Sequence, residues 1–289
     1  RIETPQTDLL AFGSVRDVNV FAATPNIDNA PLDITLRSES LASEDLNRCM
    51  PGDFVLRDRF VLDSRVSGTL PHLRCDVRTL ATRSTALHGV LLMDNLANAR
   101  PFLYTIELQP SKVWYTDIRT VLPTLKLGEL DFADHFEFSP SRIVGSKDSV
   151  GGFVDVRGVF GGVRGTIALA FPGTLRYSVN LSLNKFDSYA FTKKYSSSSR
   201  LNGDLRLTGA GTSLGSAHAS LQLALNASSF GGHDIESAVC DASLVDRILS
   251  VDTLGVLFPL SASDSAQYAF DGSSQSLALH GTVDLSNED

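Results

Sequence analysis

Apolar and polar residues alternate along much of this chain. Every second residue is Leu, Ile, Val or Phe, with polar or small residues between them, in the stretches 32–36, 167–171, 179–183, 205–207, 221–225 and 277–279. Successive side chains of a β-strand point to opposite faces, so each stretch predicts a strand with one apolar face. Gly- and Ser-rich breaks separate the stretches, among them Gly151-Gly152 and Gly161-Gly162. This pattern predicts an all-β protein of many short antiparallel strands.

Two segments of the chain resemble each other at a constant offset. Residues 34–51 align with residues 106–123, so that both ends are displaced by 72 positions. Each segment has the pattern Ile-x-Leu followed by a short amphipathic stretch that ends at a proline. We therefore expect a strand and then a short helix in both places, giving one or two short helices in the whole chain.

Four polar residues of these segments have an expected place in the helices. Ser40 and Ser111 stand where a side-chain oxygen would accept a hydrogen bond from the first helical turn, so we expect them to cap the helices. Asp45 and Asp117 correspond to each other at the same offset. We expect both carboxylates to lie in mid-helix and to be solvated.

The similarity continues more loosely beyond the two segments. Residues 66–73 resemble residues 156–163, and a third unit opens near Leu207. Repeats of this size are typical of an elongated or stacked architecture. We expect residues 1–289 to be one continuous repetitive segment of a longer chain, with the approximate units 30–100, 101–200 and 201–289.

Composition and charge exclude some classes of function. Hydrophobic residues make up 43% of the chain and charged residues 20%, which is typical of a folded protein. The net charge of −8 argues against nucleic acid as a partner, because binding phosphates requires a basic surface. No stretch approaches the ~18 consecutive apolar residues that span a bilayer. We expect any membrane anchor to lie outside this segment.

The residues that could carry chemistry do not combine into a site. Residues 211–215 match G-x-S-x-G, but a nucleophile elbow leads into a helix and here a strand pattern follows. His72 and Cys75 have a metal-binding spacing without a second pair of ligands. The acidic residues of 129–134 alternate with apolar ones, which is typical of solvated charges on a strand. We therefore expect no enzyme activity, no metal and no cofactor.

Cys49, Cys75 and Cys240 are the cysteines of the chain. An odd number of widely separated cysteines does not form a disulfide framework. We expect three small, buried or half-buried side chains. The spacing leaves open whether Cys49 and Cys75 are bonded.

Residues 201–285 resemble the repeat of the TamB branch of the AsmA-like superfamily. The pieces that carry the resemblance are Leu-Arg-Leu-Thr-Gly-Ala-Gly at 205–211, the leucine alternation of 221–225 and the turn Phe230-Gly231. The spacing Asp-x5-Pro in the two helical segments is similar to that of long AsmA-like chains. One departure is Val-Asp-Arg-Ile at 245–248, where the family usually places Asp-Gly. Because a two-residue turn favours Gly at φ > 0, we expect a longer or different loop there.

The resemblance implies a fold and a function. The fold would be an elongated, repetitive antiparallel sheet that curls lengthwise into a taco-like groove with an apolar interior. The function would be to shield phospholipid acyl chains between the inner and outer membranes of a bacterial envelope, with a link to outer-membrane protein assembly. The expected location is the periplasm, with an inner-membrane anchor outside this segment and a TamA-like outer-membrane barrel as partner.

The groove would be lined by the apolar residues of the alternating stretches. These are Ile167, Leu169, Phe171, Val179, Leu181, Leu183, Leu205, Leu207, Leu221, Leu223, Leu225, Leu277 and Leu279. An open sheet of this kind can cover acyl chains, since each CH₂ group exposed to water costs about 0.8 kcal/mol.

Other architectures fit the same alternation. Periodicity alone favours an ordinary sandwich or a solenoid, which would be a structural or adhesive surface protein without a ligand. A transmembrane barrel would need aromatic girdles, and aromatic residues make up only 8% of the chain. The repeat, the lack of a chemical site and the family resemblance together favour the open groove.

Overall fold

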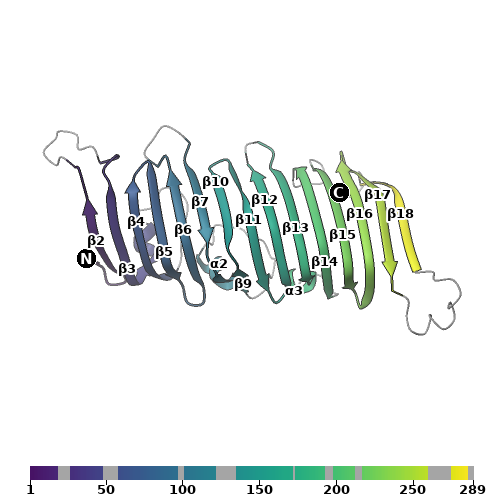
Figure 1. Cartoon of the computed structure of the whole chain (residues 1–289), viewed down its shortest axis with the longest axis horizontal. Helices are drawn as coiled ribbons and strands as arrows, with labels where there is room; N and C mark the ends of the chain where they lie inside the picture. Colours follow the sequence, from purple (N-terminus) through teal and green to yellow (C-terminus); the bar gives the residue numbers. More distant parts are fainter. Residues whose placement is uncertain are drawn as a thin grey trace. The chain divides into compact units, whose positions relative to one another are not determined.

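The described chain consists mostly of antiparallel β-strands (Figure 1). The computed structural model describes residues 1–18, 27–47, 58–96, 101–121, 135–171, 173–192, 198–211, 217–259 and 275–285. Its strands are β1 (Ile2–Glu3), β2 (Asp8–Val15), β3 (Leu32–Ala42), β4 (Arg59–Thr69), β5 (His72–Ala81), β6 (Ala86–Asp94), β7 (Leu103–Leu108), β8 (Ser111–Trp114), β9 (His135–Phe138), β10 (Ser141–Ser146), β11 (Ser149–Gly158), β12 (Gly161–Ala170), β13 (Arg176–Phe186), β14 (Ser199–Ala210), β15 (His218–Phe230), β16 (His233–Val245), β17 (Ile248–Phe258) and β18 (Gln275–Asp284). The short helices are α1 (Ser43–Asn47), α2 (Tyr115–Val121) and α3 (Ser188–Thr192). The all-β prediction is confirmed, and α3 is a helix that the sequence did not predict.

The chain divides into two compact units. Unit 1 comprises Arg1–Leu130 and Asp134–Val156, and unit 2 comprises Asp131–Ala133 and Arg157–Asp289. The boundary falls within β11. The expected subdivision into three sequence units stays a prediction.

Unit 1 is an antiparallel sheet with a small excursion. Strands β2 to β7 pair in chain order, and β10 pairs with β7 on one side and β11 on the other. Strand β8 meets β6 only at Ala86 and Lys112, and then pairs with β9. The helices α1 and α2 follow the ends of β3 and β8.

Unit 2 is a simple meander. Strands β12 to β18 pair antiparallel in chain order and lie side by side in Figure 1. Over the central residues of β12 to β15 the alternation of the sequence matches the pairing, because each hairpin keeps the same residues on the same face; register shifts occur near the ends of these strands and within β17.

Two equivalent threonine turns hold the helices of unit 1. In the first, the Thr82 hydroxyl accepts from the Thr85 backbone N–H at 3.3 Å, and the Thr85 hydroxyl accepts from the Trp114 N–H at 2.9 Å. Asp117 in α2 then accepts from the Thr82 hydroxyl at 2.6 Å and from the backbone N–H groups of Thr85 at 2.8 Å and Ser84 at 3.2 Å. These bonds fix α2 to the end of the sheet.

The second threonine turn repeats this arrangement around α1. The Thr4 hydroxyl accepts from the Thr7 N–H at 2.9 Å, and the Thr7 hydroxyl accepts from the Ala42 N–H at 3.0 Å. Thr4 donates its hydroxyl proton to Asp45 at 2.7 Å. The correspondence of Asp45 with Asp117 in the sequence is therefore also a structural correspondence.

Two expectations for the helical segments are wrong. Asp117 is not solvated: it is 9% exposed and buried by its hydrogen bonds to the threonine turn. Ser40 and Ser111 do not cap helices but lie in β3 and β8, where their hydroxyls bond to backbone groups of neighbouring segments. Those bonds hold the two serines in strands, and the helices begin three to four residues later.

The hairpin at 245–248 also differs from expectation. Val245 pairs directly with Ile248, so the loop has two residues despite the lack of glycine. Asp246 and Arg247 both have positive φ, 50° and 67°. Long flanking strands impose this turn on residues that disfavour it.

Candidate functional site

Strand register sorts the residues of unit 2 onto two faces, because residues directly opposite each other in a strand pair share a face. One face carries three successive rows that cross all strands from β12 to β18. They are Ile167–Val179–Leu207–Leu221–Ala242–Val251–Gly281, Gly165–Leu181–Leu205–Leu223–Cys240–Leu254–Leu279 and Val163–Leu183–Gly203–Leu225–Ala238–Val256–Leu277. Every position is aliphatic, Gly, Ala or Cys. We call this surface the apolar face of unit 2.

The structure brings together nearly all of the candidate groove residues. Most of them lie in the three rows. Leu169 lies on the same face in the next row, where it pairs with Tyr177. Phe171 is the exception. It follows the last residue of β12, has no strand partner and is 48% exposed.

Most side chains of this face are half-buried and few are packed in a core. Leu225 is 6% exposed, whereas Leu277 and Leu279 in β18 are 46% and 53% exposed. Leu181, Leu205 and most of their neighbours are intermediate. In the described part of unit 2, no second sheet pairs over this face, and the short α3 lies against β14 and, through Phe191, against Phe186 of β13. The leucines are sheltered mainly by one another.

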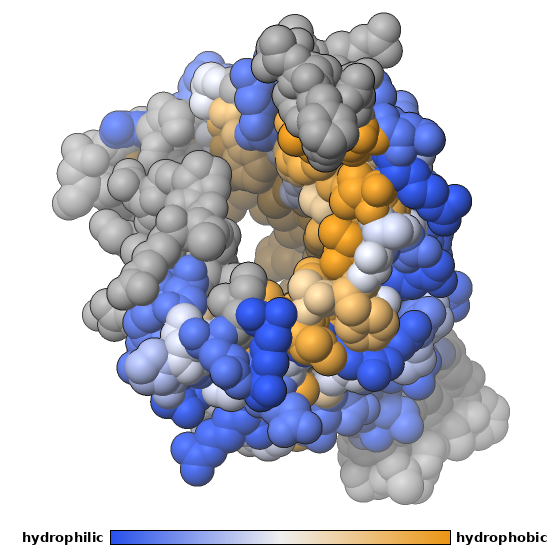
Figure 2. Space-filling view, turned by 90° about the vertical axis from the view of Figure 1, so that its left-hand side faces the viewer, coloured by the Kyte–Doolittle hydropathy of each residue, from blue (hydrophilic) through white to orange (hydrophobic). Residues whose placement is uncertain are grey.

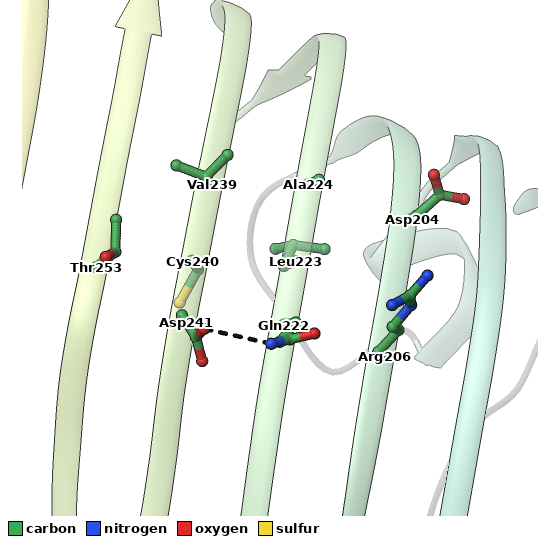
Figure 3. Close-up of a pocket in the computed structure, with 9 residues that line it drawn as sticks. All are labelled: Asp204, Arg206, Gln222, Leu223, Ala224, Val239, Cys240, Asp241 and Thr253. Atoms are coloured by element: carbon green, nitrogen blue, oxygen red, sulfur yellow. Dashed lines mark hydrogen bonds between the residues drawn. The ribbon is translucent and has the colours of Figure 1, made fainter.

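The opposite face of unit 2 is mostly polar, apart from the row Ala224–Val239–Gly255–Ala278 across β15 to β18. The Ser182 hydroxyl donates to Asp204 at 2.6 Å, and the Gln222 amide donates to Asp241 at 3.3 Å. Figure 3 shows Gln222 and Asp241 pointing toward each other from neighbouring strands, with Arg206 on the next strand. A shallow depression of about 450 Å³ lies over these residues. Its carboxylates and its guanidinium alternate along the sheet, so the depression has no single charge to select a ligand.

Unit 1 has an apolar face of the same kind. One row is Ile34–Val66–Cys75–Leu91–Ile106–Ile143–Gly152, and the next is Leu32–Gly68–Leu73–Met93–Tyr104–Gly145–Val150. In the view of Figure 2, hydrophobic residues gather around a hollow and hydrophilic residues lie on the outside. Sequence reasoning named no site residue here, although the alternation at 32–36 was its visible signal.

The outer face of unit 1 carries ion pairs between strands. Arg65 binds Asp33 with two hydrogen bonds of 2.8 and 2.6 Å, and the Arg65 bond lowers the pKa of Asp33. Arg142 lies 3.7 Å from Glu107. Both pairs are exposed, so they make this face hydrophilic but contribute little to the free energy of folding.

Helix α2 closes one margin of the apolar face of unit 1. A cavity of about 140 Å³ with almost purely apolar walls lies between Ile118 of α2, Val113 of β8 and Phe60 of β4. A second cavity of about 130 Å³ is next to it, and Leu80 and Leu87 line both. Apolar space of this kind stays dry and accepts apolar groups.

The two cysteines that the structure describes are free and belong to the apolar faces. Cys75 lies in a row of unit 1 and Cys240 in a row of unit 2. Burial raises the pKa of both thiols, which lowers the fraction of reactive thiolate at neutral pH. Cys49 lies outside the described residues.

The sequence motifs that could suggest a metal or catalytic site do not form one in the described residues. His72 faces Asp94 at 2.7 Å on the outer face, whereas Cys75 lies on the apolar face, so the two cannot share a metal. Among the described residues no group of three His, Cys, Asp or Glu side chains is placed to hold a metal ion. Residues 212–215 of the G-x-S-x-G match and the acidic stretch 129–134 lie outside the described residues.

Strand β17 supplies site residues that sequence reasoning missed. Val251, Leu254 and Val256 lie on the apolar face. A bulge at Asp252 and Thr253 shifts the register between them. The bulge inserts one residue and breaks the period of two. In the sequence, the apolar alternation of β17 is therefore split into two short stretches, one on each side of the bulge, that do not share one period of two.

Comparison with known proteins identified no relative of this chain. Searches against family models, curated proteins and solved structures found no match to this chain. None of the helices in the described ranges is long and apolar enough to cross a membrane.

Proposed function

We propose that the apolar faces of this protein shield the acyl chains of phospholipids during their movement between two membranes. The observation that carries the proposal is the set of three unbroken apolar rows across β12 to β18, backed by a polar face. A soluble protein seldom leaves so large an apolar surface without a second layer unless it binds something there.

The energetics of such a surface suit acyl chains. Each CH₂ group moved from water onto an apolar surface gains about 0.8 kcal/mol, and this gain is not directional. The rows offer no hydrogen-bonding groups that would select a headgroup. Strands ~4.8 Å apart give unit 2 a continuous apolar surface roughly 30 Å wide across its strands. A lipid would bind by its tails and keep its headgroup in water at the margin.

The cellular setting that we propose comes from the sequence resemblance. TamB-like proteins of the AsmA-like superfamily act in the periplasm, where an acyl chain must cross water between the inner and outer membranes. In that setting the chain would be an envelope-biogenesis protein, with a TamA-like barrel bound through other parts of the protein. No catalytic group is needed for this role.

The competing function is that of a structural or adhesive surface protein whose apolar face closes on itself. Half-exposed leucines across unit 2 favour the lipid-binding role over this one. A closed, dry interior in solution would favour the competitor.

Photo-crosslinking tests the proposal with matched neighbours. A benzophenone amino acid replaces Leu223 or Leu181 on the apolar face, and Gln222 or Asn180 on the polar face, in a protein exposed to radiolabelled phospholipid vesicles. We expect capture of lipid at Leu223 and Leu181 and little at Gln222 and Asn180. Equal capture in both sets, or none in either, would refute the proposal.

A further inference from the structure

The two apolar cavities of unit 1 form one continuous space along the strands β5 and β6. Leu80 and Leu87, which pair with each other, line both cavities. The cavity of about 130 Å³ lies on the apolar face, since Leu91 and Ile106 of an apolar row line it. The cavity of about 140 Å³ continues this space to Ile118 of α2. Together they give hydrocarbon a path from the apolar face to the margin of the sheet.

Position 89 keeps this space undivided. Gly89 lies between Leu87 and Leu91 on the apolar side of β6 and lines the second cavity. A Cβ at Gly89 would collide with the backbone carbonyl oxygen of Glu107 in β7, so the strand pairing admits no side chain here. Leu87 and Leu91 are separated by roughly 13 Å along the strand. The space is therefore long, and no side chain of β6 blocks it between these two leucines.

The end of the space under α2 offers a ligand no hydrogen bond. Asp117 lines it, but its carboxylate already accepts from the Thr82 hydroxyl at 2.6 Å and from the Thr85 N–H at 2.8 Å. The Thr85 hydroxyl accepts from the Trp114 N–H. Because these groups satisfy one another, the walls that face the space are almost purely apolar. A polar ligand would lose its hydrogen bonds to water on entry, whereas an apolar one would gain from burial.

The size of the space suits a hydrocarbon chain. An apolar cavity of about 150 Å³ inside a protein stays dry and binds benzene. The cavities of about 140 and 130 Å³ are of this size. By that measure each holds roughly six carbon atoms, and the two in series hold roughly a dozen. A guest that fills both must be long and thin, because Leu80 and Leu87 line their junction.

We propose that this space holds the methyl end of one acyl chain, while the rest of the chain lies along β5 and β6 on the apolar face of unit 1. The identity of the ligand rests on the proposed function, to which the inference adds a site and a direction. A polar headgroup cannot enter the dry space under α2, so it stays in water at the other end of the chain. The carboxyl end of the chain then lies near Met93 and Tyr104, which pair in the row beyond Leu91.

A photoreactive lipid tests the position and the direction of the chain. The full chain is mixed with vesicles of a phosphatidylcholine whose acyl chain carries a diazirine near either its methyl end or its carboxyl end, and the labelled residues are mapped by mass spectrometry. We expect the methyl-end probe to label Val113 and Ile118, and the carboxyl-end probe to label Met93 and Tyr104. Equal labelling of Val113 and Ile118 by both probes, or no labelling there by either, would overturn the proposal.

Two variants of α2 separate binding inside the space from contact with its surroundings. Ile118→Phe places a larger side chain in the cavity, and Thr116→Phe places the same ring on the exposed side of α2 as the control. Ile118→Phe should lower methyl-end labelling of Val113 on the order of 10-fold, as expected when about two CH₂ groups return to water. Thr116→Phe should leave this labelling unchanged. An equal response of the two variants would contradict the proposal.

The same labelling map separates this inference from the proposed function. Labelling of Leu223 or Leu181 in unit 2, with none at Val113 or Ile118, would overturn the inference and leave the proposed function standing. No labelling of the apolar face in either unit would overturn both. The comparison of the two probes needs no variant, so it decides the question even where a substitution in α2 impairs folding.

Discussion

Unit 1 and unit 2 carry the same kind of apolar face but support it in different ways. In unit 1, threonine turns bind α1 and α2 to the ends of the sheet, and buried residues such as Phe60, Val113 and Tyr115 gather at that margin. In unit 2 the strands form a plain meander, and the main buried anchor is Phe160 beside α3. Large buried aromatic side chains therefore lie at the margin of each sheet, whereas the side chains across the rows of the apolar faces are mostly half-buried.

The largest expected effect comes from the anchor of unit 2. Phe160 is 1% exposed, and its ring lies 5.1 Å from the ring of Phe191 and 6.1 Å from that of Phe186. Phe160→Ala should lower the free energy of unfolding by about 4 kcal/mol, measured by urea denaturation followed by circular dichroism. Phe171→Ala is the control, because Phe171 is 48% exposed and should cost little. Equal losses would show that unit 2 has no localised anchor.

The next largest effect is expected at the margin of unit 1. Asp117→Ala removes a buried carboxylate, takes away the acceptor of the Ser84 N–H, and leaves the Thr85 N–H with only its longer bond to the Thr82 hydroxyl. We expect a loss of about 3 kcal/mol, followed through the fluorescence of Trp114, the single tryptophan of the chain. Asp45→Ala in the equivalent turn should cost less, because Asp45 is less buried. A larger loss at Asp45 would contradict this ranking.

Acidification provides an internal check on Asp117. Burial raises its pKa, but the hydrogen bonds from Thr82, Thr85 and Ser84 outweigh burial and hold the pKa below its ordinary value of 3.8. A carboxyl with a depressed pKa stabilises the folded state fully above its unfolded value, and this contribution disappears as the pH falls below that value. The stability difference between the unmodified chain and Asp117→Asn should therefore narrow below pH 3.8 and stay constant at neutral pH.

A smaller effect is expected in the middle of the apolar face. Leu223 is half-buried, so Leu223→Ala should lower the free energy of unfolding by about 1 kcal/mol. A leucine locked in a closed core would lose about 3 kcal/mol on the same change. A loss of the larger size would indicate that a second layer covers this face.

The smallest effect is a gain in stability at the hairpin of β16 and β17. Arg247 has φ 67°, which costs a non-glycine residue about 1 kcal/mol. Arg247→Gly should raise the free energy of unfolding by up to about 1 kcal/mol, measured by thermal denaturation. Arg247→Ala removes the same side chain without relieving the strain, so it should give no gain.

Sequence reasoning succeeded where the pairing is regular. Strands β12 to β15 keep a period of two over their central residues, and twelve of the thirteen candidate residues share the apolar face. It failed where a bulge changed the phase, as at Asp252 and Thr253 in β17. The hydrogen-bond partners of Asp117 also could not be predicted from the sequence. Thr82 lies 35 residues away from Asp117, and only the folded chain brings the two together. Alternation within a strand predicts which residues share a face of the sheet. The contacts of the helices at the sheet margins join residues far apart in the sequence and cannot be predicted in this way.

The central claim is that acyl chains lie on the apolar face of unit 2. The most direct measurement places an environment-sensitive fluorophore on a single cysteine at Leu223 or at Gln222, in a background with serine at the native cysteines, and adds phospholipid with a nitroxide on its acyl chain. The account predicts strong quenching at Leu223 and weak quenching at Gln222, although the two residues are adjacent in β15. Equal quenching at both positions, or none at Leu223, would contradict it.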